Sequence, residues 1–214
     1  MAEFRWFGHT CFRLRAREAT IVTDPVGRGG GYSLPKNTPA DLITVSRNGI
    51  VATGLDGLKT EATIVRGPGE YEIHDVFVTG IRTYRNDTDD ASRQHNTVYL
   101  IEVEGMVVGH LGHLDHVLGE EQAQAMANVD ILLIPVGGGG ALEPDAAAEV
   151  VAQIAPKLVI PMRYATGQGD RELKGVEPFC KELGVEVPAP EEKLTIRQSE
   201  LGEAIRVVTL QPAG

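Results

Sequence analysis

Three histidines and one aspartate lie within a segment of seven residues, and side chains of these types can bind a metal ion. They are His110, His113, Asp115 and His116. Imidazole suits zinc or nickel, so the segment could hold a cation if the chain turns back on itself. No histidine follows His116 in the chain, so such a site would have no downstream imidazole to complete it. We therefore keep this metal site as an alternative interpretation.

The first half of the chain is predicted to consist mainly of β-strands. Short apolar or alternating runs are separated by Gly, Pro, Asn and Asp, which is typical of strands joined by turns. The predicted strands are residues 4–7, 11–15, 20–23, 42–45, 62–65, 76–82, 97–103 and 106–108.

The second half is predicted to alternate between helices and strands. The helices are residues 120–127, 144–154 and 176–183, and the strands are residues 129–136, 158–161, 193–197 and 205–210. Strands first and strand–helix alternation later favour two sheets with helices outside them. We therefore predict a layered α/β fold, in one domain spanning residues 1–214.

The composition limits the class of partner. The chain has 214 residues and a formal net charge of -10, which disfavours non-specific binding to nucleic acid or to an anionic membrane. No apolar run approaches the roughly 18 residues that a membrane helix needs, and no signal-peptide pattern opens the chain. Cys11 and Cys180 are far apart and are interpreted as buried thiols in a reducing compartment. These features predict a soluble cytoplasmic protein.

Several segments together resemble the metallo-β-lactamase superfamily. They are residues 6–12, 21–25, 41–52, 67–71 and 160–164, with the sequences WFGHTCF, IVTDP, DLITVSRNGIVA, GPGEY and IPMRY. The nearest branch resembles the small metal-dependent hydrolases related to ascorbate-6-phosphate lactonase. The resemblance implies a four-layer αββα sandwich, and it implies a homo-oligomer, since relatives often form one.

The resemblance also implies that the usual ligands of a dinuclear metal centre are replaced. The family motif His-x-His-x-Asp-His falls on Arg47, Gly49, Val51 and Ala52, and three further ligand positions fall on Arg85, His113 and Arg163. A guanidinium group stays protonated and has no lone pair to offer a cation. On this basis we predict no metal cofactor.

Three arginines at one site would favour an anion instead. We predict a metal-independent, non-catalytic protein, a pseudoenzyme, whose pocket binds a small anionic ligand such as a phosphorylated metabolite. The residues expected to line this pocket are Arg47, Arg85, Arg163, His113, Asp24 and His9. Two alternatives remain open. One is a hydrolase of an ester, lactone or phosphodiester that uses zinc or another divalent metal at the His110–His116 cluster. The other is a scaffold for protein contacts, with its arginines neutralised by nearby carboxylates.

Overall fold

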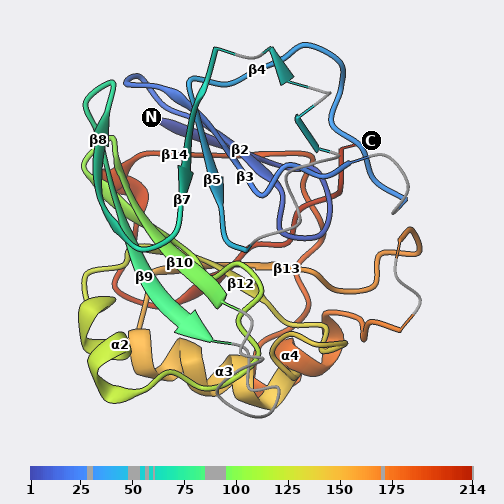
Figure 1. Cartoon of the computed structure of the whole chain (residues 1–214). Helices are drawn as coiled ribbons and strands as arrows, with labels where there is room; N and C mark the ends of the chain where they lie inside the picture. Colours follow the sequence, from blue (N-terminus) through green and yellow to red (C-terminus); the bar gives the residue numbers. More distant parts are fainter. Residues whose placement is uncertain are drawn as a thin grey trace.

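Two β-sheets pack face to face in the computed structural model of the chain (Figure 1). The structure describes residues 1–27, 31–47, 54–55, 58–59, 61–84, 95–169 and 172–213. The six-stranded sheet has the order β14-β1-β2-β3-β5-β7, and the seven-stranded sheet has the order β15-β13-β12-β11-β10-β9-β8. A two-stranded pair, β4 (Thr38–Pro39) with β6 (Leu58–Lys59), is separate from both.

The six-stranded sheet is built mainly from the start of the chain. Its strands are β1 (Ala2–Trp6), β2 (Phe12–Arg15), β3 (Thr20–Thr23), β5 (Leu42–Val45), β7 (Thr63–Arg66) and β14 (Leu194–Ile196). Strand β5 runs parallel to both β3 and β7, so these three strands end at the same edge of the sheet.

The seven-stranded sheet joins an antiparallel half to a parallel half. The antiparallel strands are β8 (Gly69–Ile73), β9 (Val76–Tyr84), β10 (His95–Val103) and β11 (Met106–His110). Strand β11 then runs parallel to β12 (Ile131–Pro135), which continues to β13 (Leu158–Met162) and β15 (Arg206–Val207). Strands β12 and β13 are buried along their whole length, which is typical of parallel strands covered on both faces.

Helices cover the outer face of the seven-stranded sheet (Figure 1). They are α2 (Glu120–Ala125), α3 (Pro144–Ile154) and α4 (Glu177–Glu182), and a short 3₁₀ helix, η2 (Gln198–Glu200), follows β14. Helix α3 begins at a proline, whose missing N–H costs nothing there, and it buries Ala147, Val150, Val151 and Ile154. That spacing places the four side chains on one face of the helix.

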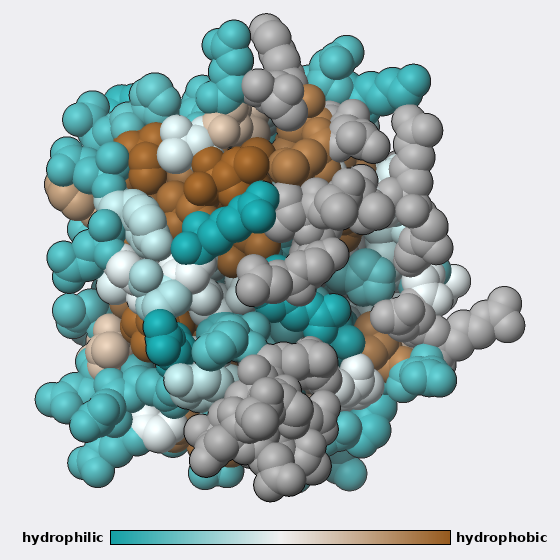
Figure 2. Space-filling model, in the orientation of Figure 1, coloured by the Kyte–Doolittle hydropathy of each residue, from teal (hydrophilic) through white to brown (hydrophobic). Residues whose placement is uncertain are grey.

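The main hydrophobic core lies between the sheets and under the helices. Its largest fully buried side chains include Trp6, Tyr99, Phe4, Phe12 and Phe179. A second cluster, which includes Phe7, Val22 and Ile43, is separate from this core. Figure 2 shows hydrophobic surface on the face seen in Figure 1, and Ile64 on the edge strand β7 is 37% exposed.

The predicted sandwich of two sheets is confirmed. Both cysteines are buried and free, which agrees with their interpretation as thiols. Among the described residues, no helix is long and apolar enough to cross a membrane.

Candidate active site

The ends of strands from both sheets meet at one edge of the sandwich. Asp24 follows β3, Ser46 follows β5, His110 ends β11 and Arg163 follows β13. The two sheets are joined here by hydrogen bonds: Arg163 N–H donates to the His9 carbonyl, at 3.1 Å, and His110 Nε2 lies 2.8 Å from the Thr10 carbonyl oxygen. Side chains that are far apart in the sequence therefore converge at this edge.

Asp24, Ser46 and His113 form a buried chain of hydrogen bonds at the centre of the site. The Asp24 carboxylate accepts the Ser46 backbone N–H at 2.7 Å and the Ser46 hydroxyl at 2.6 Å. Ser46 Oγ lies 3.3 Å from His113 Nδ1, and Asp24 Oδ2 lies 3.8 Å from the same nitrogen. All three residues are buried.

These contacts define which nitrogen of His113 carries the proton. A carboxylate can only accept, so the Ser46 hydroxyl donates to Asp24 and leaves an oxygen lone pair for His113. Nδ1 of His113 then donates its hydrogen to Ser46, and Nε2 carries the free lone pair. His113 is thereby prepared to accept a proton at Nε2.

The backbone beside His113 is held by a second buried polar side chain. Asn96 Oδ1 accepts the His113 N–H at 2.9 Å, and Asn96 Nδ2 donates to Thr83 Oγ1 and to the Leu111 carbonyl. Gly112 has a φ of +58°, and a Cβ there would lie 2.4 Å from Ser46 Cβ. The turn before His113 thus depends on glycine, both for its conformation and for the close approach of Ser46.

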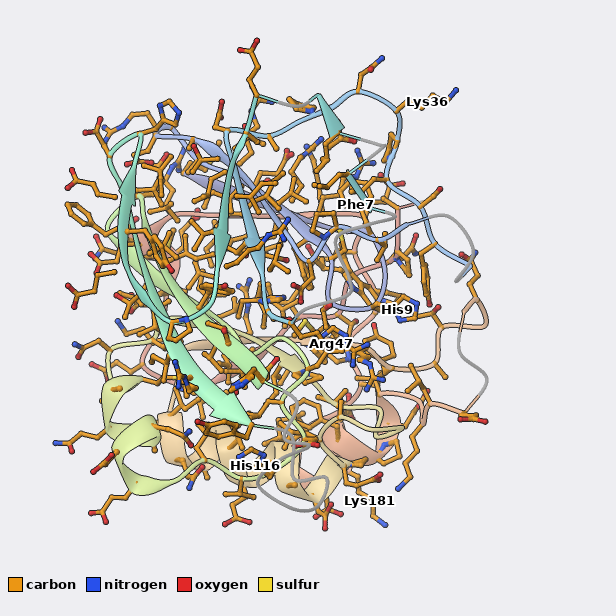
Figure 3. All side chains as sticks on the ribbon, in the orientation of Figure 1. Phe7, His9, Lys36, Arg47, His116 and Lys181 are labelled. Carbon is orange, nitrogen blue, oxygen red and sulfur yellow. The ribbon has the colours of Figure 1, made fainter. Side chains whose placement is uncertain are left out.

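Two arginines contribute positive charge to the site. Burial lowers the pKa of His113 well below its usual value, and the charges of Arg47 and Arg163 lower it further. The Arg163 guanidinium also donates to the carbonyls of Gly138 and Gly139, at 3.0 and 2.9 Å, which holds the glycine-rich loop after β12. Figure 3 shows Arg47 and His9 in the same part of the molecule. Arg85 lies outside the described residues.

His9 lies at the border of the site, where both its backbone carbonyl and its ring make contacts. Its carbonyl accepts the Trp6 Nε1–H as well as the Arg163 N–H, and its ring meets Tyr32 edge-on with centroids 4.9 Å apart. His9, Asp24 and Arg163 have φ values of 46°, 39° and 51°, which non-glycine residues rarely adopt. Such backbone conformations tend to cluster at functional sites.

The His110–His116 cluster does not form one metal site. His110 is buried and its Nε2–H donates to Thr10, while His116 Nδ1 lies 2.9 Å from Asp115 Oδ1 and His113 faces Ser46. In the described part of the chain, no group of three or more His, Cys, Asp or Glu side chains is arranged to hold a metal ion. The predicted cation site at these four residues is therefore not supported by their geometry.

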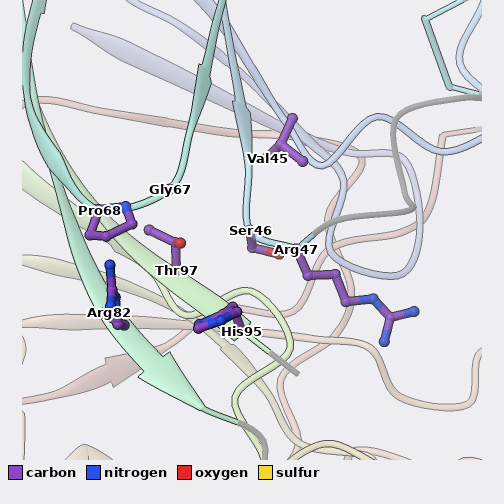
Figure 4. Close-up of a pocket in the computed structure, with 8 residues that line it drawn as sticks. All are labelled: Val45, Ser46, Arg47, Gly67, Pro68, Arg82, His95 and Thr97. Carbon is purple, nitrogen blue, oxygen red and sulfur yellow. The ribbon is translucent and has the colours of Figure 1, made fainter. Parts of the chain in front are cut away.

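A pocket of about 210 Å³ opens beside Ser46, between the two sheets (Figure 4). Its lining comes from the end of β5, the turn between β7 and β8, and the facing strands β9 and β10. Sequence reasoning missed this pocket and the roles of Ser46 and Asn96. The sequence gives one weak signal for Asn96, which is a polar residue at the start of a strongly apolar strand.

The two buried histidines lead us to expect reduced stability in mild acid. Burial lowers the pKa of His110 and of His113, so the folded protein binds fewer protons than the unfolded chain, whose histidines titrate near 6.5. The resulting stabilisation is complete above about pH 6.5 and is lost as the pH falls below it, at up to about 1.4 kcal/mol per pH unit for each histidine. Urea melts of the His113→Gln variant should show a shallower fall than the wild type. An identical slope would contradict this account.

Comparison with known proteins agrees with this architecture. Residues 3–163 match the family model of the beta-lactamase superfamily domain. A crystal structure assigned to a zinc-dependent hydrolase of the metallo-β-lactamase superfamily from Thermotoga maritima is 30% identical, covers 99% of this chain and 100% of its own, and has a TM-score of 0.78. The fold and the matched residues place the chain in the metallo-β-lactamase superfamily.

Two related proteins narrow the assignment from the superfamily to one family. A UPF0173 metal-dependent hydrolase of Thermoplasma acidophilum is 30% identical over 187 residues, covering 75% of this chain and 82% of the relative. A UPF0173 protein of Pyrococcus furiosus is 28% identical over 194 residues, covering 83% of this chain and 89% of the relative. The chain belongs to the UPF0173 metal-dependent hydrolase family.

These relatives overturn three of our predictions. The non-catalytic anion-binding interpretation, the description as a metal-independent pseudoenzyme and the absence of a metal cofactor are all wrong as main conclusions, because relatives are named metal-dependent hydrolases. The error lay in treating the ligand replacements implied by the resemblance as decisive. The buried Asp24–Ser46–His113 chain can perform acid–base chemistry whatever the role of Arg47 and Arg163.

The described residues nevertheless do not fit a dinuclear metal centre. Asp24 and His113 are the side chains of metal-ligating type that approach each other at this edge. Asp24 already accepts two hydrogen bonds from Ser46. Residues 48–53 contain no His, Cys, Asp or Glu, whereas residues 85–94 contain Asp87, Asp89 and Asp90. A cation would need ligands beyond the described residues, so we assign no catalytic step to it.

Proposed function

We propose that the protein is a hydrolase that cleaves an ester, lactone or phosphodiester bond in a small anionic substrate, with His113 as the general base. The observation that carries this proposal is the hydrogen-bond chain from Asp24 through Ser46 to His113 Nδ1. It leaves Nε2 as the nitrogen that can take a proton from an attacking water molecule.

The electrostatics of the site support this role. Burial first, and then the charges of Arg47 and Arg163, lower the pKa of His113, so the imidazole is neutral at physiological pH with its Nε2 lone pair unprotonated, although the same effects make it a weaker base. The same arginines supply positive charge that would stabilise a negatively charged transition state. The resemblance to ascorbate-6-phosphate lactonase supports a substrate that carries phosphate or carboxylate.

We include dependence on a divalent cation in this proposal because relatives are named metal-dependent hydrolases. Our interpretation that Arg47, Arg85, His113 and Arg163 stand where the ligands of other family members do stays a prediction. We also propose a cytoplasmic location and a homo-oligomeric assembly, and both stay predictions from the sequence.

A hydrolysis screen tests the proposed activity. Purified protein would be assayed against nitrophenyl esters, lactones and a bis-nitrophenyl phosphodiester, with and without added zinc or manganese. We expect turnover of one substrate class, loss of that turnover on adding a chelator, and recovery when the cation is restored. Background rates for every substrate in every metal would overturn the proposal.

A further inference from the structure

We propose that the pocket between the two sheets is a subsite for a negatively charged substituent, phosphate or carboxylate, on the part of the substrate that does not react. This inference rests on the proposed function, because it names a feature of the substrate of the same site. The pocket is lined by Arg82 and His95 together with Thr97 and the Gly67–Pro68 turn, and it adjoins Val45 and Ser46.

The charge of the pocket favours an anion. Among the described residues that line it, Arg82 and His95 are basic and none is acidic, although the chain as a whole has a net charge of -10. In the described part of the chain, no ion pair is formed by Arg82 or His95 with a carboxylate. A guanidinium fork donates two parallel hydrogen bonds to a phosphate or carboxylate, so Arg82 is suited to this ligand.

The walls of the pocket are held in place by the fold. Arg82 pairs with Thr97 across β9 and β10, and His95 packs against Tyr84 with ring centroids 5.3 Å apart. The Gly67 N–H donates to the Tyr99 hydroxyl, which in turn donates to the Val45 carbonyl at 2.8 Å. Figure 4 shows Arg82, His95 and Thr97 close together, with the Arg47 guanidinium extending away from them.

The size of the pocket indicates that it holds part of a substrate. Its volume of about 210 Å³ is below the roughly 300 Å³ at which pockets for whole small ligands begin. Ser46 belongs both to the pocket lining and to the chain that orients His113. An anion held by Arg82 would therefore direct the rest of the substrate past Ser46 toward the general base.

Titration calorimetry with inorganic phosphate, and in parallel with acetate, tests the subsite. We expect the wild-type protein to bind one of these anions, and the stronger of the two identifies the substituent as phosphate or carboxylate. Arg82→Gln should weaken that binding about tenfold or more, equal to about 1.4 kcal/mol. Arg206→Gln, on β15 at the opposite edge of the same sheet, removes the same charge and should bind as the wild type does.

The outcomes separate this inference from the proposed function. If neither anion binds the wild type, or if both arginine variants bind alike, the subsite is wrong even when hydrolysis is found. If phosphate binds in an Arg82-dependent way and no substrate is hydrolysed, the subsite stands and the hydrolase fails. When both hold, Arg82→Gln should raise KM for the anionic substrate by about the factor by which it weakens anion binding.

Discussion

The His113→Gln variant is expected to lose hydrolytic activity, with kcat lowered by about 10²–10⁴-fold. That is the usual contribution of a positioned general base, and glutamine has no group that can take up a proton near neutral pH. The wild-type pKa of His113 lies well below its usual value, so the wild-type rate should stay high down to mildly acidic pH. The residual rate of the His113→Gln variant should not depend on pH through the titration of this side chain.

Two measurements and one control variant accompany the kinetics of this variant. The melting temperature at neutral pH should be close to that of the wild type, because the buried imidazole is neutral there and glutamine is uncharged as well. Cation content, measured on the same samples, separates the loss of a base from the loss of bound metal. His74→Asn, at the exposed turn between β8 and β9, provides the control, since asparagine tolerates the φ of 52° found there. A kcat for His113→Gln within threefold of the wild type would contradict the assignment of His113 as the base.

Much of the fold could be predicted from the sequence because its strands and helices have clear apolar patterns. The predicted strands at residues 20–23 and 42–45 and the helix at residues 144–154 have the observed bounds. Strand β8 was missed, because Gly69–Ile73 contains two glutamates, is mostly exposed and lies at the edge of its sheet. Tyr71 and Ile73 alternate with the glutamates and are partly buried against the core, but two apolar residues are too short a pattern to identify a strand.

The site was only partly predictable, because its chemistry depends on contacts between the two sheets. Asp24 and His113 were named as site residues from family resemblance, whereas Ser46 links them only after β3 and β5 end side by side. The alternative metal site from His110 to His116 could not be judged from the sequence for a related reason. His110 lies at the end of a strand with its ring turned to Thr10, and residues close in sequence need not face one centre.

The Asp24→Asn variant is expected to reverse the hydrogen-bond chain while leaving the fold intact. Asparagine tolerates the φ of 39° at this position, and its carbonyl oxygen can still accept the Ser46 N–H. Its amide would then donate to Ser46 Oγ, where the carboxylate accepted a hydrogen. Ser46 would in turn donate to His113 Nδ1, so the ring proton would move to Nε2 and the base would be lost. Asp24 is thus a positioning residue that acts through Ser46.

A change of tautomer separates this role from a structural one. Nitrogen NMR of labelled protein should show His113 protonated at Nδ1 in the wild type and at Nε2 in Asp24→Asn. The kcat should fall by a factor similar to that for His113→Gln, because the wrong tautomer cannot accept the proton from water. KM and phosphate binding at Arg82 should change little. Asp24→Ala serves as the contrasting variant: it leaves the buried Ser46 N–H without its acceptor, at a cost of about 1–3 kcal/mol in stability. If Asp24→Asn keeps both the Nδ1 tautomer and the wild-type kcat, the chain from Asp24 to His113 does not set the protonation of the base.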